Sequence, residues 1–425
     1  MKKLIAISML LSVLWISPAN VGATVTSDLM VGFPPKVHTQ VTFANYRDYP
    51  QSKWSFNNIS AVFNTALIPR GQQHWQFNNK GKKLNKETAA YISKVFANNE
   101  ADSVIITQNG NVLHEEYWNF AAEQKQHIWF SVTKSLVSSA FGVLLEEGKV
   151  ALTDSPVKYL PELKNSGFER VTIQQLLNHS TGIDFKENYS DPNSEFMRYY
   201  APAMNMAYIP SGRDANPQNT EIYGIYDFLS KFVKMDEKVI PGDVFDYNSA
   251  NTDVLGWLIS RVSGMPLNDF LYQHIWKKIG ATHDAYIAVD RAYMPVATAG
   301  MSTTLRDAAK FGLLILQDGQ FNGEQVLPKQ WLDQITQVSD KQKRNMAVNP
   351  KYKNAGWEAY NNMWWILDSD KGEFAASGIH GQVIYINKAK NVVAVFYSSQ
   401  KIAANPYSEK YANKLSALRK VVNQL

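Results

Sequence analysis

The chain has 425 residues, of which 45% are hydrophobic and 12% aromatic, enough apolar material for one large core or two fused cores. The formal net charge is only +5 and the lysines are dispersed, so composition argues against a nucleic-acid-binding surface. The chain contains no cysteine, which excludes disulfides and a lipid-modified cysteine. Its stability must therefore come from packing.

The first 23 residues have the pattern of a secretory signal peptide. Lys2 and Lys3 precede the apolar stretch 4–16, and small residues follow at 21–23. The alternative is an uncleaved anchor, but the apolar stretch is shorter than the roughly 18 to 20 residues that span a bilayer. We expect cleavage after Ala23, export to the periplasm or exterior of a bacterial cell, and no stable membrane insertion afterwards.

A β-hairpin is the first regular structure that the mature chain predicts. Residues 24–80 are rich in Pro, Asn and aromatic residues without a sustained period, and we interpret them as an ordered arm that wraps the domain. The β-type segments 103–107 and 112–117 then flank the turn dipeptide Asn109-Gly110.

The middle of the chain is predicted to be mainly helical. Apolar residues recur at helical spacing from Ser131 to Glu147, and this helix is apolar enough to be buried. At 306–317 the adjacent residues Arg306 and Asp307 are interpreted as an ion pair at a helix start. The other expected helices are 171–178, 226–233 and 252–263.

Strands near both ends of the chain predict the fold class. A second hairpin, with strands 383–386 and 392–397, precedes an amphipathic helix over 406–424. We therefore expect an α/β (α+β) protein in which one antiparallel sheet is assembled from distant segments and flanked by helices, with an inserted helical subdomain. The expected single catalytic domain is 24–425, with the sheet subdomain and its N-terminal arm in 24–130 and 300–425, and the mainly helical subdomain in 131–299.

Ser131 and Lys134 form a Ser-x-x-Lys pair at the start of the buried helix. Residues three apart lie on one helix face, so the hydroxyl and the amine can touch. A serine needs a base to become nucleophilic, and a lysine serves only if burial and cationic neighbours lower its pKa from about 10.4. The N–H groups at the helix N-terminus suit an oxyanion beside Ser131.

The Ser-x-x-Lys pattern is weak evidence when taken alone. Ser131 could instead be an ordinary N-cap with a surface lysine one turn later. A second match, Ser155 to Lys158, contains Pro156 and follows a turn-like pair, which makes it a poor nucleophile site.

A second motif, about a hundred residues later, supports a catalytic interpretation of Ser131. The Ser131 region resembles the serine β-lactamase, penicillin-binding protein and class C-like esterase superfamily, in which Ser-x-x-Lys opens a central helix. That superfamily has a Tyr-x-Asn or Tyr-x-Ser element, which Tyr247-Asn248-Ser249 matches. The resemblance implies that Tyr247 is the catalytic tyrosine: near a lysinium its phenol could lose a proton, accept that of Ser131, and return one to the leaving group.

The third motif of the superfamily is aligned with residues 376–378, Ala-Ser-Gly. The resemblance then implies that the N–H groups of Ile379 and Ser131 form the oxyanion hole, although the register could shift by one or two residues. No Lys or Arg falls in the motif under any register. Because that cation helps hold a substrate carboxylate in β-lactamases and carboxypeptidases, its absence argues against both as the main activity.

Further stretches resemble the branch that contains 6-aminohexanoate-dimer (nylon-oligomer) hydrolases and related esterases. They are 176–185, 187–189, 304–312 and 378–382. In that branch a tyrosine closes over the substrate, and Tyr189 matches it, with simple loop packing as the alternative. The resemblance also implies substrate contacts from four other residues, with His380 as a polar wall of the pocket: Ser249, Asn251, Gly378 and His380.

These motifs predict two-step acyl transfer through Ser131 on small amides or esters. The alternatives are a cell-wall peptidase acting on D-amino acid peptides, a weak β-lactamase, and a non-catalytic ligand-binding homologue. No metal-binding, nucleotide-binding or other hydrolase motif is found in the sequence, so we expect no metal and no cofactor. Neither the oligomeric state nor the physiological substrate follows from the motifs.

Overall fold

The structure is a computed structural model that describes residues 28–189, 191–207, 222–352, 354–403 and 409–425. The expected signal peptide and the first residues of the arm lie outside these ranges. Within them, no helix combines the length and the apolar character needed to cross a membrane.

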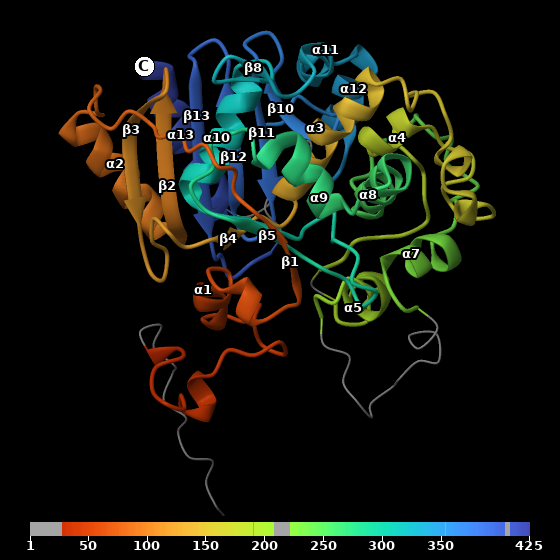
Figure 1. The fold of residues 1–425 in the computed structure, drawn as a ribbon, viewed down its shortest axis with the longest axis horizontal. Coiled ribbons are helices and arrows are strands. Elements are labelled where there is room, and N and C mark those ends of the chain that lie inside the picture. Colours follow the sequence, from red (N-terminus) through yellow and green to blue (C-terminus); the bar gives the residue numbers. More distant parts are fainter. Residues whose placement is uncertain (1–27, 190, 208–221, 353, 404–408) are drawn as a thin grey trace, which may run out of the picture.

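A seven-stranded sheet forms the centre of the molecule (Figure 1). Its order is β3-β2-β13-β12-β11-β10-β9, and every neighbouring pair is antiparallel. Both predicted hairpins, β2–β3 and β12–β13, are confirmed, and β13 pairs with β2 across nearly 300 residues of sequence. The strands are β2 (Ala101–Gln108), β3 (Asn111–Tyr117), β9 (Ala359–Asn361), β10 (Trp364–Asp368), β11 (Glu373–Gly378), β12 (Gln382–Asn387) and β13 (Val392–Ser398).

Helices cover both faces of this sheet. Because neighbouring side chains of a strand point to opposite faces, odd and even positions of β13 contact different helices. Val393 lies against Gly312 of α10 (Leu305–Leu316), whereas the Phe396 ring packs on Phe96 of α2 (Lys86–Asn98) at 5.2 Å and on Tyr411 of α13 (Glu409–Gln424). The apolar run of β13 is therefore buried on both sides.

The helical region lies beside one end of the sheet. The expected buried helix is α3 (Val132–Glu146), and it packs against α8 (Ala250–Ser263), which Gly264 ends in a left-handed conformation at φ +71°. The predicted helices over 171–178, 226–233, 252–263 and 306–317 are confirmed as α4 (Ile173–Leu177), α7 (Ile225–Asp227) continued by a π-helix (Phe228–Phe232), α8 and α10. Of the helix predicted over 406–424, residues 406–408 lie outside the described residues, and the rest is confirmed as α13. Two further helices lie in this region. A π-helix (Phe196–Tyr200) leads into α5 (Ala201–Ala203), and α9 (Leu267–Leu271) continues as a second π-helix (Tyr272–Trp276).

A second, four-stranded sheet was not predicted. Its order is β1-β5-β6-β4, and it joins the arm to the rest of the molecule because β1 pairs with β5. Strands of two to four residues are too short to show an alternating pattern, which explains the omission. They are β1 (Thr65–Ile68), β4 (His127–Ile128), β5 (Ala285–Ala288) and β6 (Met301–Thr303).

The remaining elements are short. They are α1 (Gln51–Ser55), α11 (Lys329–Asp333), α12 (Asp340–Val348), the strands β7 (Gln320–Phe321) and β8 (Glu324–Gln325), and 3₁₀ turns at Val37–Thr39, Ile59–Ala61, Pro156–Lys158, Pro161–Leu163 and Gln334–Thr336.

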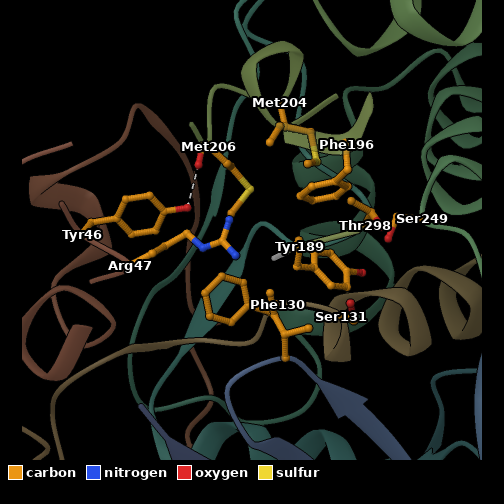
Figure 2. A pocket seen from close by; sticks show the side chains of 13 residues that line it. Tyr46, Arg47, Phe130, Ser131, Tyr189, Phe196, Met204, Met206, Ser249 and Thr298 are labelled. Atoms are coloured by element: carbon orange, nitrogen blue, oxygen red, sulfur yellow. Dashed lines mark hydrogen bonds between the residues drawn. The ribbon is translucent and has the colours of Figure 1, made fainter. Parts of the chain in front are cut away.

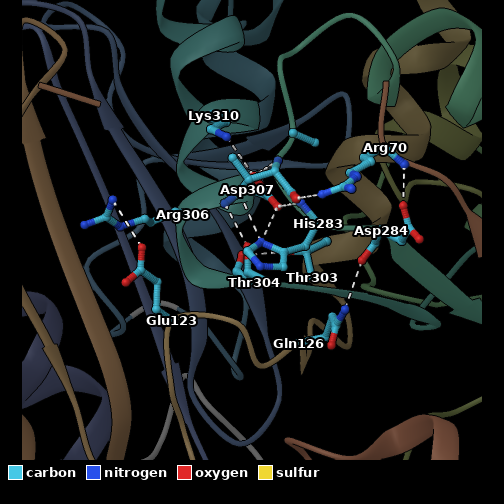
Figure 3. Close-up of polar contacts among 12 residues, drawn as sticks. Arg70, Glu123, Gln126, His283, Asp284, Thr303, Thr304, Arg306, Asp307 and Lys310 are labelled. Atoms are coloured by element: carbon cyan, nitrogen blue, oxygen red, sulfur yellow. Dashed lines mark hydrogen bonds and ion pairs between the residues drawn. The ribbon is translucent and has the colours of Figure 1, made fainter. Parts of the chain in front are cut away.

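The expected pair of Arg306 with Asp307 is wrong. Adjacent residues of a helix point in different directions, and Figure 3 shows the two side chains leaving α10 toward separate partners. Arg306 binds Glu115 of β3 through two nitrogens at 2.7 Å, whereas Asp307 pairs with Lys310 at 2.9 Å and accepts the N–H of residue 282. Burial would raise the pKa of Asp307, but hydrogen bonds from His283 and the Lys310 charge hold it well below its usual value. Asp307 thus joins α10 to the segment before β5.

Candidate active site

Ser131 stands immediately before α3 and is not an ordinary N-cap. Its φ of −64° and ψ of −8° are helical, and its side chain makes no capping hydrogen bond. Instead, the Ser131 hydroxyl, in a residue that is 9% exposed, accepts a 2.9 Å hydrogen bond from the amine of Lys134. Phe130, just before it, has φ +45°, in the left-handed region that bulky residues rarely adopt.

Lys134 is buried, with 1% of its surface exposed. Its amine also donates to the carbonyl oxygen of Thr298 at 3.0 Å. Burial lowers the pKa of Lys134 to about 8, against the opposing charges of Glu187 and Asp253. The expected contribution of cationic neighbours is therefore wrong: desolvation lowers the pKa, and acidic groups limit the shift.

Tyr247 reaches Ser131 from the loop before α8. Its ring stacks on Trp365, with 5.4 Å between centroids, and Lys134 Nζ lies 5.1 Å from its centroid. Burial and the Glu187 charge raise the pKa of the Tyr247 phenol far above 10, while a hydrogen bond with Ser131 acts in the opposite direction. These surroundings favour the neutral phenol and oppose the expected loss of its proton beside a lysinium.

His179 positions the tyrosine loop. It is fully buried at φ +49°, its Nδ1 accepts the N–H of Asn248 at 3.0 Å, and its ring lies 4.8 Å from that of Tyr247. Burial and the Lys134 charge lower the pKa of His179 well below its usual value, so the ring is neutral. His179 lies in the family-like stretch 176–185, but no motif in the sequence assigns it a role.

Two acidic residues near Lys134 were not singled out in the sequence. Asp253 of α8 accepts the N–H of Thr298 at 2.9 Å and the Tyr200 hydroxyl, and burial raises its pKa to about 7. Glu187 accepts the N–H of Ser249 and the hydroxyl of Tyr189. An isolated Asp or Glu has no local signal, because its role depends on which distant groups it meets.

The third motif lies directly against the serine. A Cβ on Gly378, at the end of β11, would stand 2.4 Å from the Trp129 carbonyl oxygen and 3.1 Å from the Ser131 nitrogen, so only glycine allows this approach. Ile379 follows and lines the same pocket as Ser131. Ser377 points elsewhere, since its hydroxyl lies 3.0 Å from that of Tyr411 in α13.

The structure does not bring His380 or Asn251 to the surface of this pocket. The buried His380 ring lies 5.0 Å from that of Phe56, and its Nδ1 is 2.6 Å from the carbonyl oxygen of Gln400. Burial lowers the pKa of His380 to about 3. Asn251 is buried in α8 and accepts the Thr181 hydroxyl at 3.0 Å.

A pocket opens in front of Ser131 (Figure 2). Tyr189 and Ser249, two of the expected substrate-contacting residues, line it, and the Tyr189 ring packs edge-on against Phe196. Arg47, which no sequence motif marks, extends from the arm into the pocket (Figure 2). The walls are mostly apolar, and the other lining residues are Tyr46, Phe130, Phe196, Ala201, Met204, Met206, Thr298, Ala299 and Ile379.

The competing Ser-x-x-Lys sequence serves a structural role. The Ser155 hydroxyl accepts the N–H of Val157 at 3.3 Å, and Lys158 pairs with Asp154 at 2.9 Å. In the part of the chain that the structure describes, no three His, Asp or Glu side chains gather as ligands for a metal ion.

Comparison with known families agrees with this geometry. The family model described as Beta-lactamase matches residues 93–419, which include the serine, tyrosine and glycine segments. The chain belongs to the Beta-lactamase family. The expected family, and with it the β-lactamase and penicillin-binding-protein type of fold, are thereby confirmed.

Two relatives cover nearly all of this Beta-lactamase family member. A 6-aminohexanoate-dimer hydrolase of Paenarthrobacter ureafaciens is 27% identical over 378 residues, 86% of this chain and 90% of the relative. A solved structure named as a putative 6-aminohexanoate-dimer hydrolase from Bacillus anthracis superposes with a TM-score of 0.78 at 27% identity, covering 91% and 98% of the two chains. The hydrolase EstCE1, at 17% identity and a TM-score of 0.59 over 78% and 98%, shares the fold.

Proposed function

We propose that this protein is an exported serine hydrolase that cleaves amide or ester bonds of small substrates through an acyl-enzyme on Ser131. The observation that supports it best is the 2.9 Å hydrogen bond from the buried amine of Lys134 to the Ser131 hydroxyl. A buried lysine with a pKa of about 8 has an appreciable share of free amine near neutral pH, and a free amine can accept the serine proton.

Acylation begins when Ser131 Oγ attacks the substrate carbonyl carbon and its proton passes to Lys134. The carbonyl oxygen becomes an oxyanion, for which we propose the N–H groups of Ser131 and Ile379 as donors. The bond to the leaving group then breaks, and Tyr247 hands its phenol proton to the departing nitrogen or oxygen while it is reprotonated from Lys134.

Deacylation reverses these roles with water as the nucleophile. Tyr247 takes a proton from water as it passes its own phenol proton to Lys134, and hydroxide adds to the acyl carbon. The proton then returns by the same route to Ser131 Oγ, which leaves. The products are a carboxylic acid and an amine or alcohol. Because burial raises the pKa of Tyr247, its neutral phenol is better suited to donate a proton to the leaving group than to act as a base in the resting enzyme.

Export is part of this proposal and rests on the signal pattern of residues 1–23. N-terminal sequencing of protein recovered from a bacterial host's periplasm or medium should find Thr24 first. Recovery of uncleaved protein only from the cytoplasm would contradict export while leaving the chemistry untouched.

Covalent labelling tests the chemistry without a known substrate. Mature wild type, Ser131→Ala and Tyr247→Phe are exposed to a fluorophosphonate probe and weighed as intact proteins. We expect one adduct on the wild type that maps to Ser131, none on Ser131→Ala, and strongly slowed labelling of Tyr247→Phe. A folded wild type that stays unlabelled would instead favour the non-catalytic ligand-binding homologue.

A further inference from the structure

Arg47 is held in place at the pocket by the residue before it. The Tyr46 hydroxyl donates to the carbonyl oxygen of Met206 at 2.7 Å, and its backbone carbonyl accepts the Ser55 hydroxyl at 2.5 Å. The Tyr46 ring also packs edge-on against Phe63, with centroids 4.7 Å apart. Because Tyr46 is fixed at both ends, the next residue is directed toward Ser131, as Figure 2 shows.

In the described ranges, the charge of Arg47 has no carboxylate partner. Among the described residues, no Asp or Glu lies within ion-pairing distance of its guanidinium, although Arg306 and Arg419 each bind a glutamate through two nitrogens. Burial raises the pKa of Tyr46 to about 12, and the adjacent Arg47 opposes this rise. The Tyr46 hydroxyl therefore stays neutral, and it does not compensate the positive charge of Arg47.

The surroundings make this cation effective toward an anion. The walls beside it include Phe130, Met206 and Ile379, and apolar walls reduce screening of the charge. Glu187, an acidic residue near the pocket, is already engaged with Ser249 and Tyr189. A guanidinium presents several N–H donors in the planar arrangement that a carboxylate accepts in pairs.

We propose that Arg47 binds a carboxylate of the substrate, so that the preferred substrates are amides or esters that also carry a free carboxylate. This inference rests on the proposed function and specifies its substrate class. The positive charge that the third motif lacks is then supplied by the N-terminal arm, from more than 300 residues earlier in the chain. Arg47 acts on binding and specificity, and takes no part in proton transfer.

Matched ester pairs test the inference and distinguish where the carboxylate stands. For the acyl side, p-nitrophenyl hemiglutarate is compared with p-nitrophenyl pentanoate. For the leaving-group side, p-acetoxybenzoate is compared with methyl p-acetoxybenzoate. The measured quantity is the ratio of kcat/KM for the anionic ester to that for its neutral partner, which removes effects of stability and of general activity.

The variants are Arg47→Gln, Arg47→Lys and, as a control for loss of one surface charge, Arg170→Gln. Arg170 is exposed and pairs with Glu237 at 2.6 Å. In at least one ester pair, wild type should favour the anionic ester, and Arg47→Gln should lower the ratio about tenfold to a hundredfold, the range for a charge-assisted hydrogen-bonded pair. Arg47→Lys should retain part of the preference, and Arg170→Gln all of it.

The outcomes separate this inference from the proposed function. If the neutral esters are hydrolysed through Ser131 but Arg47→Gln leaves both ratios unchanged, the carboxylate site is refuted and the hydrolase stands. A fall in the ratio that Arg47→Lys also shows in full would refute recognition by charge. If wild type neither hydrolyses any ester nor reacts with the fluorophosphonate, the proposed function fails and this inference with it.

Discussion

Replacing Glu187 by glutamine tests how acidic neighbours act on Lys134. Burial lowers the pKa of Lys134 to about 8, and the Glu187 charge opposes that fall. Glutamine has nearly the same shape, so its carbonyl can still accept the N–H of Ser249 and its amide can face the Tyr189 hydroxyl. The substitution thus removes a charge and preserves the contacts. Asp253, the other acidic neighbour of Lys134, remains in both proteins.

The expected shift follows from electrostatics. At an effective dielectric constant of about 20, two unit charges roughly 5 to 10 Å apart interact by about 1.7 to 3.3 kcal/mol. Since Glu187 is half-exposed, solvent reduces this to about 1.4 kcal/mol, or about one pKa unit. The pKa of Lys134 then falls from about 8 to about 7.

In the proposed mechanism only the free amine activates Ser131, so this shift should accelerate labelling at low pH. At about pH 6 the free-amine fraction rises from about 1% to about 9%, which predicts roughly ninefold faster reaction with a fluorophosphonate. At about pH 9 both proteins are mostly deprotonated at Lys134, and the predicted ratio is about one. A structural defect would instead slow the reaction at every pH.

The assay is the labelling rate, followed by intact-protein mass across about pH 5 to 10. Glu237→Gln is the control, because it removes an exposed charge that pairs with Arg170 at the surface. An unchanged midpoint in Glu187→Gln, or one moved to higher pH, would refute the assignment of Glu187 as a group that raises the pKa of Lys134.

Two further predictions concern the frame around the site. Gly378→Ala places a methyl group 2.4 Å from the Trp129 carbonyl oxygen, so the chain at Ser131 must shift. Labelling by the fluorophosphonate should slow at least about tenfold. A labelling rate equal to that of the wild type would contradict this contact. Asp307→Asn leaves Lys310 buried without its counter-charge and should cost about 3 kcal/mol near neutral pH, measured by urea unfolding. The folded-state pKa of Asp307 is depressed, so the ionised carboxylate stabilises the folded protein above its unfolded pKa, and this contribution declines as pH falls. The unfolding free energies of the two proteins should therefore converge in strong acid. A difference that persists there would contradict the ion pair.

Local sequence patterns were sufficient for most regular elements and for naming the three side chains that meet in the candidate active site. The helical period over 131–147 and the hairpin around Asn109-Gly110 arise from interactions between residues close in the chain, and the structure contains both. Ser131, Lys134 and Tyr247 were identified because motif spacing is a property of the chain itself, and the structure brings the three together.

Tertiary structure alone decided the electrostatics and the lining of the pocket. The pKa of Lys134 depends on burial and on Glu187 and Asp253, which approach it only after folding. Likewise, Arg47 enters the pocket because Tyr46 is bonded to Met206, a residue 160 positions away, and His380 turns into the core although its motif borders the pocket. Desolvation and Coulomb energies depend on distances through space, and the order of residues along the chain does not specify those distances.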